Sequence, residues 1–463
     1  MSPGAARSTP TTAEPLDRRR APVAFDAKAF RFPAVTRRTT GGGLTLLAIQ
    51  RTDTPLTLLR FVNRAGGHFD PPASSGLASF VGSLLDEGTR QRNAVAIADQ
   101  IEGRGGYLSS GSDWDSSAVS AGALSKHLPF CLDLIAEVAS YPAFDPVETD
   151  RMRSLRLAEL QRLLADPGTL AGRAFARALY RDHVYARSLV GTPETIARME
   201  REDCAKFWER HQTQRGAFLL AAGDLDPEAL HASLGEAFAG LTSDEPPALP
   251  PLDPPEAPGP EIHVVDLPQA AQAELRVGHL GVPRNHPERP TLLLLNSILG
   301  GKFTSRINLN LRERHGYTYG ASSRFVDRVG TGPFLVAAAV DTAVAGRALQ
   351  EIVTELRRLQ DEPPASVELE DSRSYLLGVF PYTLQTLDGL VSRLEELAVH
   401  DLPDDYYAAF PERLRQVTVD DVHSAATRYL APDRLIIGVA GPAKDLVPQL
   451  EPFGPVVVHA PSL

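Results

Sequence analysis

Ser79, Gly82 and Ser83 share one face of a predicted helix, at the i, i+3 and i+4 spacing that a metal site on a helix would use. The helix is indicated by "GLASFVGSLLDEGT" (residues 76–89), whose apolar residues recur with a helical period. A catalytic zinc ion needs three protein ligands and a water, with a general base nearby. The hydroxyls of Ser79 and Ser83 and the hydrogen atom of Gly82 supply neither the three zinc ligands nor the general base. This face is therefore predicted to hold no catalytic zinc.

The same stretch carries two structural predictions. Gly88 follows the last periodic apolar residue, so we expect it to be the C-cap of the helix. Three small side chains leave room beside the helix, so we expect the bare face to line a cavity. The apolar stripe of this helix consists of Leu77, Phe80, Val81, Leu84 and Leu85.

Other residue types offer few alternative sites. The two cysteines, Cys131 and Cys204, are far apart, which excludes a disulfide framework and a cysteine-based zinc site. The twelve histidines are scattered, and no pair has the spacing of metal ligands. A Gly-x-Ser-x-Gly nucleophile elbow is absent from the sequence. We expect no cofactor to be bound by this chain.

Composition limits the partners and the compartment. The net charge of −11 argues against a nucleic-acid partner, and no apolar run approaches the ~20 residues of a membrane span. The first residues lack the apolar core of a secretory signal, so residues 1–25 are predicted to be a disordered leader and the protein to be cytoplasmic.

A proline-rich segment divides the chain. Residues 242–262 contain eight prolines, which exclude a regular helix or a central strand. We interpret this segment as a semi-rigid linker between an N-terminal domain (residues 26–241) and a C-terminal domain (residues 263–463), with a hinge there.

The two halves repeat each other, which indicates a duplicated α+β domain. Residues 216–238 and 433–454 both predict a strand, a turn and a helix, and a similar helix precedes each. Each half also contains two consecutive helices joined by a Pro-containing turn, and each opens with strand-like runs. Strand pairs combined with long helices predict two sandwich domains, each a mostly antiparallel sheet with helices on one face.

Residues 64–89, "RAGGHFDPPASSGLASFVGSLLDEGT", resemble the signature of the insulinase/pitrilysin family of zinc metallopeptidases, the inverzincins. The family helix carries H-x-x-E-H. The resemblance places Ser79 at the first histidine, Gly82 at the glutamate and Ser83 at the second histidine. Glu159, in "SLRLAELQRLL", is in the place of the family's third zinc ligand. The zinc site is therefore degenerate, and the fold implied is the two-domain fold of mitochondrial-processing-peptidase-like proteins.

Residues 296–325, "NSILGGKFTSRINLNLRERHGYTYGASSRF", resemble the C-terminal-domain motif of the same family. The resemblance implies that an arginine and a tyrosine of this motif reach a zinc site on the facing domain, where they bind substrate and stabilise an oxyanion. Tyr317 is a nearby competitor, but the spacing favours Tyr319. The matching residues are Gly300 and Gly301 at a Gly-rich turn, Ser305, Arg306, Arg312 and Tyr319.

An empty zinc half combined with an intact Arg/Tyr half resembles the non-catalytic subunit of a heterodimeric peptidase. The resemblance then implies a partner that carries H-x-x-E-H and the zinc, and a peptide substrate. Three alternatives stay open: a structural scaffold subunit, a peptide-binding protein without chemistry, and a zinc enzyme that acts alone. The sequence leaves undecided whether the partner is a different protein or a second copy.

Overall fold

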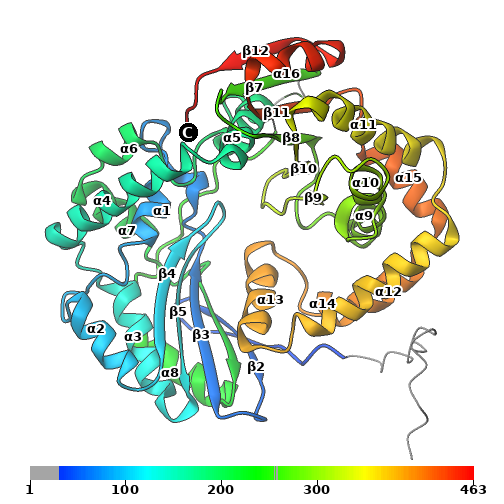
Figure 1. Cartoon of the computed structure of the whole chain (residues 1–463). Coiled ribbons are helices and arrows are strands. Elements are labelled where there is room, and N and C mark those ends of the chain that lie inside the picture. The colour runs from blue at the N-terminus through cyan, green and yellow to red at the C-terminus, as the bar shows by residue number, and fades with distance from the viewer. Residues whose placement is uncertain (1–30, 255, 257–258) are drawn as a thin grey trace, which may run out of the picture. The chain divides into compact units, whose positions relative to one another are not determined.

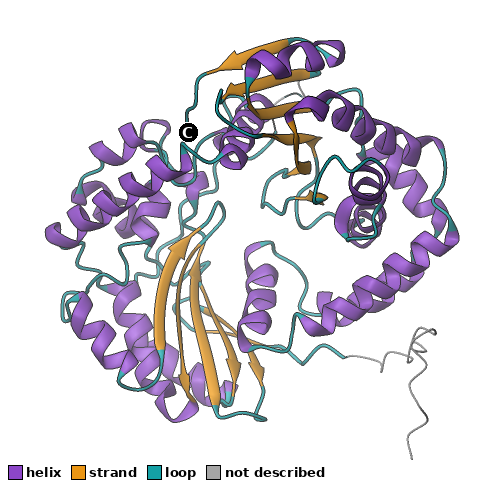
Figure 2. Ribbon diagram, viewed as in Figure 1, coloured by secondary structure: helices purple, strands orange, loops and turns teal. Residues whose placement is uncertain are grey.

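The computed structural model describes residues 31–254, 256 and 259–463. The predicted leader, residues 1–25, lies outside these residues. The described chain contains two six-stranded sheets, with helices packed around them (Figures 1 and 2). Within the described residues, no helix is both long enough and apolar enough to span a bilayer.

The first sheet has the strand order β1-β2-β6-β3-β5-β4. All neighbouring strands in it are antiparallel except β2 and β6, which are parallel. Its strands are β1 (Thr36–Thr39), β2 (Thr45–Gln50), β3 (Leu56–Asn63), β4 (Tyr107–Ser112), β5 (Ser117–Leu124) and β6 (Phe218–Gly223).

The second sheet has the order β12-β7-β11-β8-β10-β9, and β7 is parallel to both β11 and β12. The order β7-β11-β8-β10-β9 repeats β2-β6-β3-β5-β4 of the first sheet, which confirms the duplicated α+β fold. Its strands are β7 (Glu261–Asp266), β8 (Gln272–Leu280), β9 (Ala321–Phe325), β10 (Pro333–Asp341), β11 (Ile436–Gly441) and β12 (Val456–His459).

The helices also correspond between the halves. Those of the first half are α1 (Leu77–Gly82), α2 (Ala94–Glu102), α3 (Leu128–Ser140), α4 (Pro146–Leu163), α5 (Pro167–Tyr180), α6 (Pro193–Arg198), α7 (Arg201–His211) and α8 (Pro227–Ala237). Those of the second half are α9 (Arg289–Asn296), α10 (Arg306–Asn308), α11 (Ala345–Asp361), α12 (Ser366–Tyr382), α13 (Leu387–Val399), α14 (Tyr406–Gln416), α15 (Val419–Tyr429) and α16 (Ala443–Leu450). Two π-helices, η5 (Ser297–Gly301) and η6 (Leu309–Arg314), flank α10.

One helix from each half packs on the sheet of the other half, and we call these two helices, α5 and α13, the exchanged helices. Helix α5 of the first half packs on β7, β8 and β11, and helix α13 of the second half packs on β2, β3 and β6 (Figure 1). The approach of α5 is close, because a Cβ atom on Gly438 of β11 would lie 2.3 Å from the carbonyl oxygen of Ala171. The sequence predicts helices on one face of each sheet, and this exchange adds a helix to the opposite face.

Ion pairs attach the exchanged helix α13 to the first sheet. The guanidinium of Arg60 on β3 lies 2.6 Å from Glu395 and 2.8 Å from Asp388, both on α13. Arg64, just after β3, pairs with Asp401 and donates to the carbonyl of Ala398 at 3.0 Å. The two halves are therefore joined by helix packing and by charge, in addition to the chain connection.

Candidate functional site

A buried aspartate accepts hydrogen bonds from the backbone N–H groups at the start of helix α1, the helix that carries the degenerate motif. The backbone N–H groups of Gly76 and Ala78 donate to the two carboxylate oxygens of Asp70 at 2.7 and 2.8 Å. Gly76 has a φ of +91°, and its Cα faces the backbone of Gly191 so closely that a side chain would not fit. Burial raises the pKa of Asp70 to about 7, although the backbone N–H groups of Ala78 and Gly76 oppose this shift.

The helix itself is shorter than predicted. It ends at Gly82 with Ser83 as C-cap, whereas Gly88 has a φ of +135° and forms an isolated β-bridge with Asn93. The prediction of Gly88 as C-cap is therefore wrong. Leu84 and Leu85 are still fully buried, because the turn after the helix returns them to the core.

An arginine side chain occupies the space between two of the predicted zinc-site positions. Arg156 on α4 donates from Nη1 to Ser79 Oγ at 3.1 Å, and its Nε lies 3.2 Å from Glu159 Oε2. The same Nη1 lies 3.3 Å from the carbonyl oxygen of Val190. Burial lowers the pKa of Arg156, and the nearby charge of Glu159 opposes this shift. The structure thus brings Ser79 and Glu159 together around a guanidinium.

Of the other two positions, Gly82 packs against backbone atoms of β4, and the hydroxyl of Ser83 forms a hydrogen bond with its own helix. Ser83 Oγ donates to the carbonyl of Phe80 at 2.7 Å. A Cβ atom at Gly82 would lie 2.8 Å from the carbonyl carbon of Gly111 and 2.8 Å from the nitrogen of Ser112 on β4. With Arg156 against Ser79 and β4 against Gly82, the expected cavity along this face is wrong.

These residues do not fit the zinc ion that the motif would hold in an intact site. Serine hydroxyls and a glycine replace the ligands, and the cation of Arg156 would repel Zn²⁺ electrostatically. In the described part of the chain, no group of three or more His, Cys, Asp or Glu residues is placed to hold a metal.

Gly82→Ala is expected to lower the free energy of unfolding by about 1–3 kcal/mol, because the added methyl group collides with rigid β4 backbone. Urea denaturation would measure this change. The matched control is Gly235→Ala in α8, where a Cβ atom meets nothing within 4 Å. That change should stabilise the protein by about 0.5–1 kcal/mol, since alanine favours helix. Equal effects at the two sites would contradict the tight packing of Gly82.

Arg312 lies in the π-helix η6, a rare form of helix that is frequent at functional sites. Its guanidinium carbon is 4.4 Å from the ring centroid of Phe303, and its Nε is 3.4 Å from Glu313 Oε1. About a third of the side chain is exposed. Arg312 is therefore held over an aromatic ring with part of its donor edge open to solvent.

Tyr319 projects into solvent in the loop before β9, with 91% of its surface exposed. Tyr317, the competing candidate, instead stacks on His315 with ring centroids 4.9 Å apart, and the guanidinium of Arg347 covers it. Among the described residues, no hydrogen bond joins Tyr319 to Arg312. Of the two tyrosines, Tyr319 is the one available to a molecule outside this chain.

Gly300 and Gly301 end the π-helix η5, so the expected Gly-rich turn is wrong in form. A Cβ atom on Gly300 would lie 2.4 Å from Ser323 Oγ on β9, and one on Gly301 would lie 2.6 Å from Asn296 Nδ2. Ser305 is the N-cap residue of α10, and Arg306 pairs with Glu368 through two bonds of 2.8 Å. Gly300 thus lets the π-helix η5 lie directly on β9, and Gly301 lets it turn closely against Asn296.

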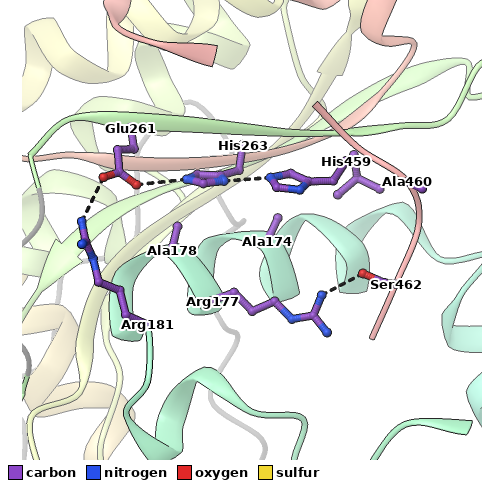
Figure 3. Close-up of a pocket in the computed structure, with 10 residues that line it drawn as sticks. Ala174, Arg177, Ala178, Arg181, Glu261, His263, His459, Ala460 and Ser462 are labelled. Atoms are coloured by element: carbon purple, nitrogen blue, oxygen red, sulfur yellow. Dashed lines mark hydrogen bonds and ion pairs between the residues drawn. The ribbon is translucent and has the colours of Figure 1, made fainter. Parts of the chain in front are cut away.

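A second polar cluster was not predicted from the sequence (Figure 3). His263 Nδ1 on β7 lies 2.9 Å from His459 Nε2 on β12, and His263 Nε2 lies 3.3 Å from Glu261 Oε2. Glu261 also pairs with Arg181 at 3.0 Å, beside a cavity of about 330 Å³. The two histidines are 196 residues apart, so only the parallel pairing of β7 with β12 brings them together.

Comparison with known proteins finds family models that match residues in both halves of the chain. Residues 47–193 match the model of the insulinase family (peptidase family M16), and residues 198–376 match the model of the peptidase M16 inactive domain. An uncharacterized zinc protease of Streptomyces coelicolor is 25% identical over 425 residues, covering 89% of this chain and 90% of the relative. One from Mycobacterium tuberculosis is 28% identical over 389 residues, covering 81% and 86%.

Solved structures show the same fold. A structure described as a peptidase M16 inactive domain from Pseudomonas fluorescens has a TM-score of 0.83 and 26% identity, covering 88% of this chain and 98% of that one. A chain of complex III2 from Candida albicans has a TM-score of 0.76 at 17% identity, covering 89% of this chain and 97% of that one, which shows the fold alone. The two family models, the duplicated sheets and the degenerate helix α1 agree: the chain belongs to the insulinase (peptidase M16) family.

Proposed function

We propose that this chain is the non-catalytic subunit of a two-subunit zinc peptidase and contributes Arg312 and Tyr319 to its partner's site. One contrast carries the proposal. Arg156 fills the chain's own degenerate metal position, whereas Tyr319 is 91% exposed and Arg312 keeps part of its donor edge open. The chain has lost the residues for metal chemistry but still presents two hydrogen-bond donors to another molecule.

The different roles proposed for the two subunits follow from the chemistry of these hydrogen-bond donors. A guanidinium is always charged and offers fixed N–H donors, and a phenol adds one O–H donor. Donors of this kind stabilise negative charge on the oxygen of a peptide carbonyl as it is attacked. The partner, a homologue with an intact H-x-x-E-H, would bind the zinc ion and supply the general base. No cofactor is assigned to this chain itself.

The test is reconstitution with a purified H-x-x-E-H homologue from the same organism. Fluorogenic peptides are expected to be cleaved by the mixture and by neither protein alone, and the two proteins should co-elute in gel filtration. Zinc analysis should find the metal with the homologue. Hydrolysis by this chain alone, or one zinc ion per isolated chain, would refute the proposal. Co-elution without any cleavage would favour a scaffold subunit instead.

A further inference from the structure

Helix α5 separates two cavities on the same face of the second sheet. On one side lies the histidine cluster of Figure 3, and on the other lies a cavity of about 740 Å³. We call the second one the arginine cavity, because five arginines line it and only two carboxylates, Asp166 and Glu274, do so. The surplus of three positive charges is opposite in sign to the net charge of −11 of the whole chain. The arginines are Arg173, Arg187, Arg276, Arg324 and Arg328.

The strand register explains why the charges of the sheet gather there. Leu335 on β10 pairs with Arg324 on β9 and with Gly278 on β8, so these three residues share one face of the sheet. Arg276 lies two residues before Gly278 and therefore points to the same face. Gly278 meets Phe175 of α5, which identifies this face as the one beneath the exchanged helix.

Of the five arginines, only Arg276 forms an ion pair with a carboxylate among the residues that the structure describes. Arg276 pairs with Glu274 at 2.8 Å. Arg187 instead donates to the carbonyl of Asp70 at 2.7 Å, and Arg328 donates to the carbonyl of Asp327 at 3.1 Å. In the part of the chain that the structure describes, Arg324 has no ion pair. Burial, followed by the positive charges of Arg276 and Arg328, lowers the pKa of Arg324.

The corresponding position of the first half has a different source of carboxylates. Arg60 on β3 pairs with Leu220 on β6, just as Arg276 on β8 pairs with Gly438 on β11. Arg60 is neutralised by two carboxylates of the exchanged helix α13. Helix α5, its counterpart on the second sheet, contributes Arg173 to its cavity and has no carboxylate within Pro167–Tyr180, although its N-cap residue Asp166 also lines the cavity. The exchanged helix α13 thus brings carboxylates to its sheet, whereas the exchanged helix α5 brings an arginine.

The edge of β9 is closed to strand addition, which directs recognition to the side chains. The backbone N–H of Ala321 donates to Asn308 Oδ1 at 3.0 Å, and Asn296 Nδ2 donates to the carbonyl of Ser323 at 3.0 Å. These outward groups of the edge strand already have partners. A ligand in the cavity would therefore be recognised by the guanidinium groups, whose planar geometry suits carboxylates.

We propose that the arginine cavity binds the carboxylate side chains of an acidic peptide and selects such peptides for the reaction proposed above. As a statement about substrate choice, the inference rests on that proposed function, but binding by the isolated chain does not. Carboxylates are favoured over phosphate groups because Asp166 and Glu274 also line the cavity and would repel a dianion more strongly than a monoanion.

The first experiment measures binding to this chain alone by fluorescence anisotropy. The probes are a labelled octapeptide with four glutamates and the same peptide with glutamines in their place. The glutamate peptide is expected to bind at least ~10-fold more tightly at low salt, and its affinity should fall as sodium chloride is added. Arg324→Gln and Arg328→Gln should each weaken that binding by ~10-fold, corresponding to about 1.4 kcal/mol.

The control variant is Arg357→Gln, which removes the same charge from an exposed arginine outside the cavity. It should leave peptide affinity within twofold of wild type, and thermal denaturation should show that all three variants are folded. Equal affinity for the glutamine peptide, or equal effects of the three variants, would overturn the inference. So would tight binding of tripolyphosphate without binding of the glutamate peptide.

Cleavage by the reconstituted mixture separates the two proposals. Charge-selective binding without any cleavage would refute the proposed function and leave the cavity assignment standing. Cleavage of both peptides at the same rate would refute the selection of acidic peptides and leave the proposed function standing.

Discussion

Replacing Arg312 with alanine is expected to lower peptide turnover by the reconstituted complex by about 10²–10³-fold, because removing one donor to a developing oxyanion typically has this effect. Tyr319→Phe, which removes only a hydroxyl, should lower turnover by a similar factor. Initial rates at saturating peptide would measure both. Neither side chain is part of the hydrophobic core, so the variants should fold and associate with the partner as the wild type does.

Two matched controls come from the same segment. Arg314→Ala removes an equal charge two residues away on the exposed side of η6, and Tyr317→Phe removes the hydroxyl of the tyrosine that is stacked on His315. Both controls should retain turnover within a few-fold of wild type. If Arg312→Ala and Tyr319→Phe cleave at the wild-type rate while the complex still forms, this chain has no part in the chemistry.

Arg284→Ala is expected to produce the largest loss of stability, about 3–5 kcal/mol in the free energy of unfolding, because it removes a buried guanidinium from an ion-pair network and takes from Glu396 one of its two arginine partners. Arg284 Nη2 lies 2.7 Å from Glu396 Oε2 at the end of α13, and its Nη1 donates to the hydroxyl of Tyr406 at 3.0 Å. Only 6% of the arginine side chain is exposed. Burial acts to raise the pKa of Glu396, but the charges of Arg393 and Arg284 outweigh it and hold that pKa below its usual range.

Urea denaturation of the isolated chain at neutral pH would measure the loss. The control is Arg357→Ala, whose ion pair with Asp433 is at the surface, with 55% and 82% of the two side chains exposed. Such a pair contributes about 0–1 kcal/mol, so the control should unfold almost like wild type. A loss below 1 kcal/mol in Arg284→Ala would mean that the network does not hold the end of α13.

The architecture could be predicted from the sequence because its signals are local. Alternating and continuous apolar runs mark strands such as β2 and β3, and the repeated strand–turn–helix units mark β6 with α8 and β11 with α16. The end of α1 could not be predicted, since Leu84 and Leu85 continue the apolar period although they lie in a turn. Burial alone does not distinguish a helix from a turn that packs on the same core.

The flanking residues located the degenerate motif on a helix, but not the contacts that its side chains make. The spacing favours Tyr319 over Tyr317, and the role of Tyr319 stays a prediction. The contact of Arg156 with Ser79 depends on how α4 packs beside α1, 77 residues apart in sequence. The arginine cavity depends on an exchanged helix and on the pairing of three strands. Interactions of this kind leave no local pattern of residues that could be recognised in advance.

The exchange of α5 and α13 decides which parts of the molecule could move as units to admit a peptide. Because α5 packs on the second sheet and α13 on the first, a movement that separated the two halves at residues 242–262 would strip a helix from each sheet. Each sheet could move without that loss only if it moved together with the helix that packs on it from the other half. The flexible joints would then lie in the short connections on either side of α5 and α13, where a spin label or an inserted proline would act on the motion directly.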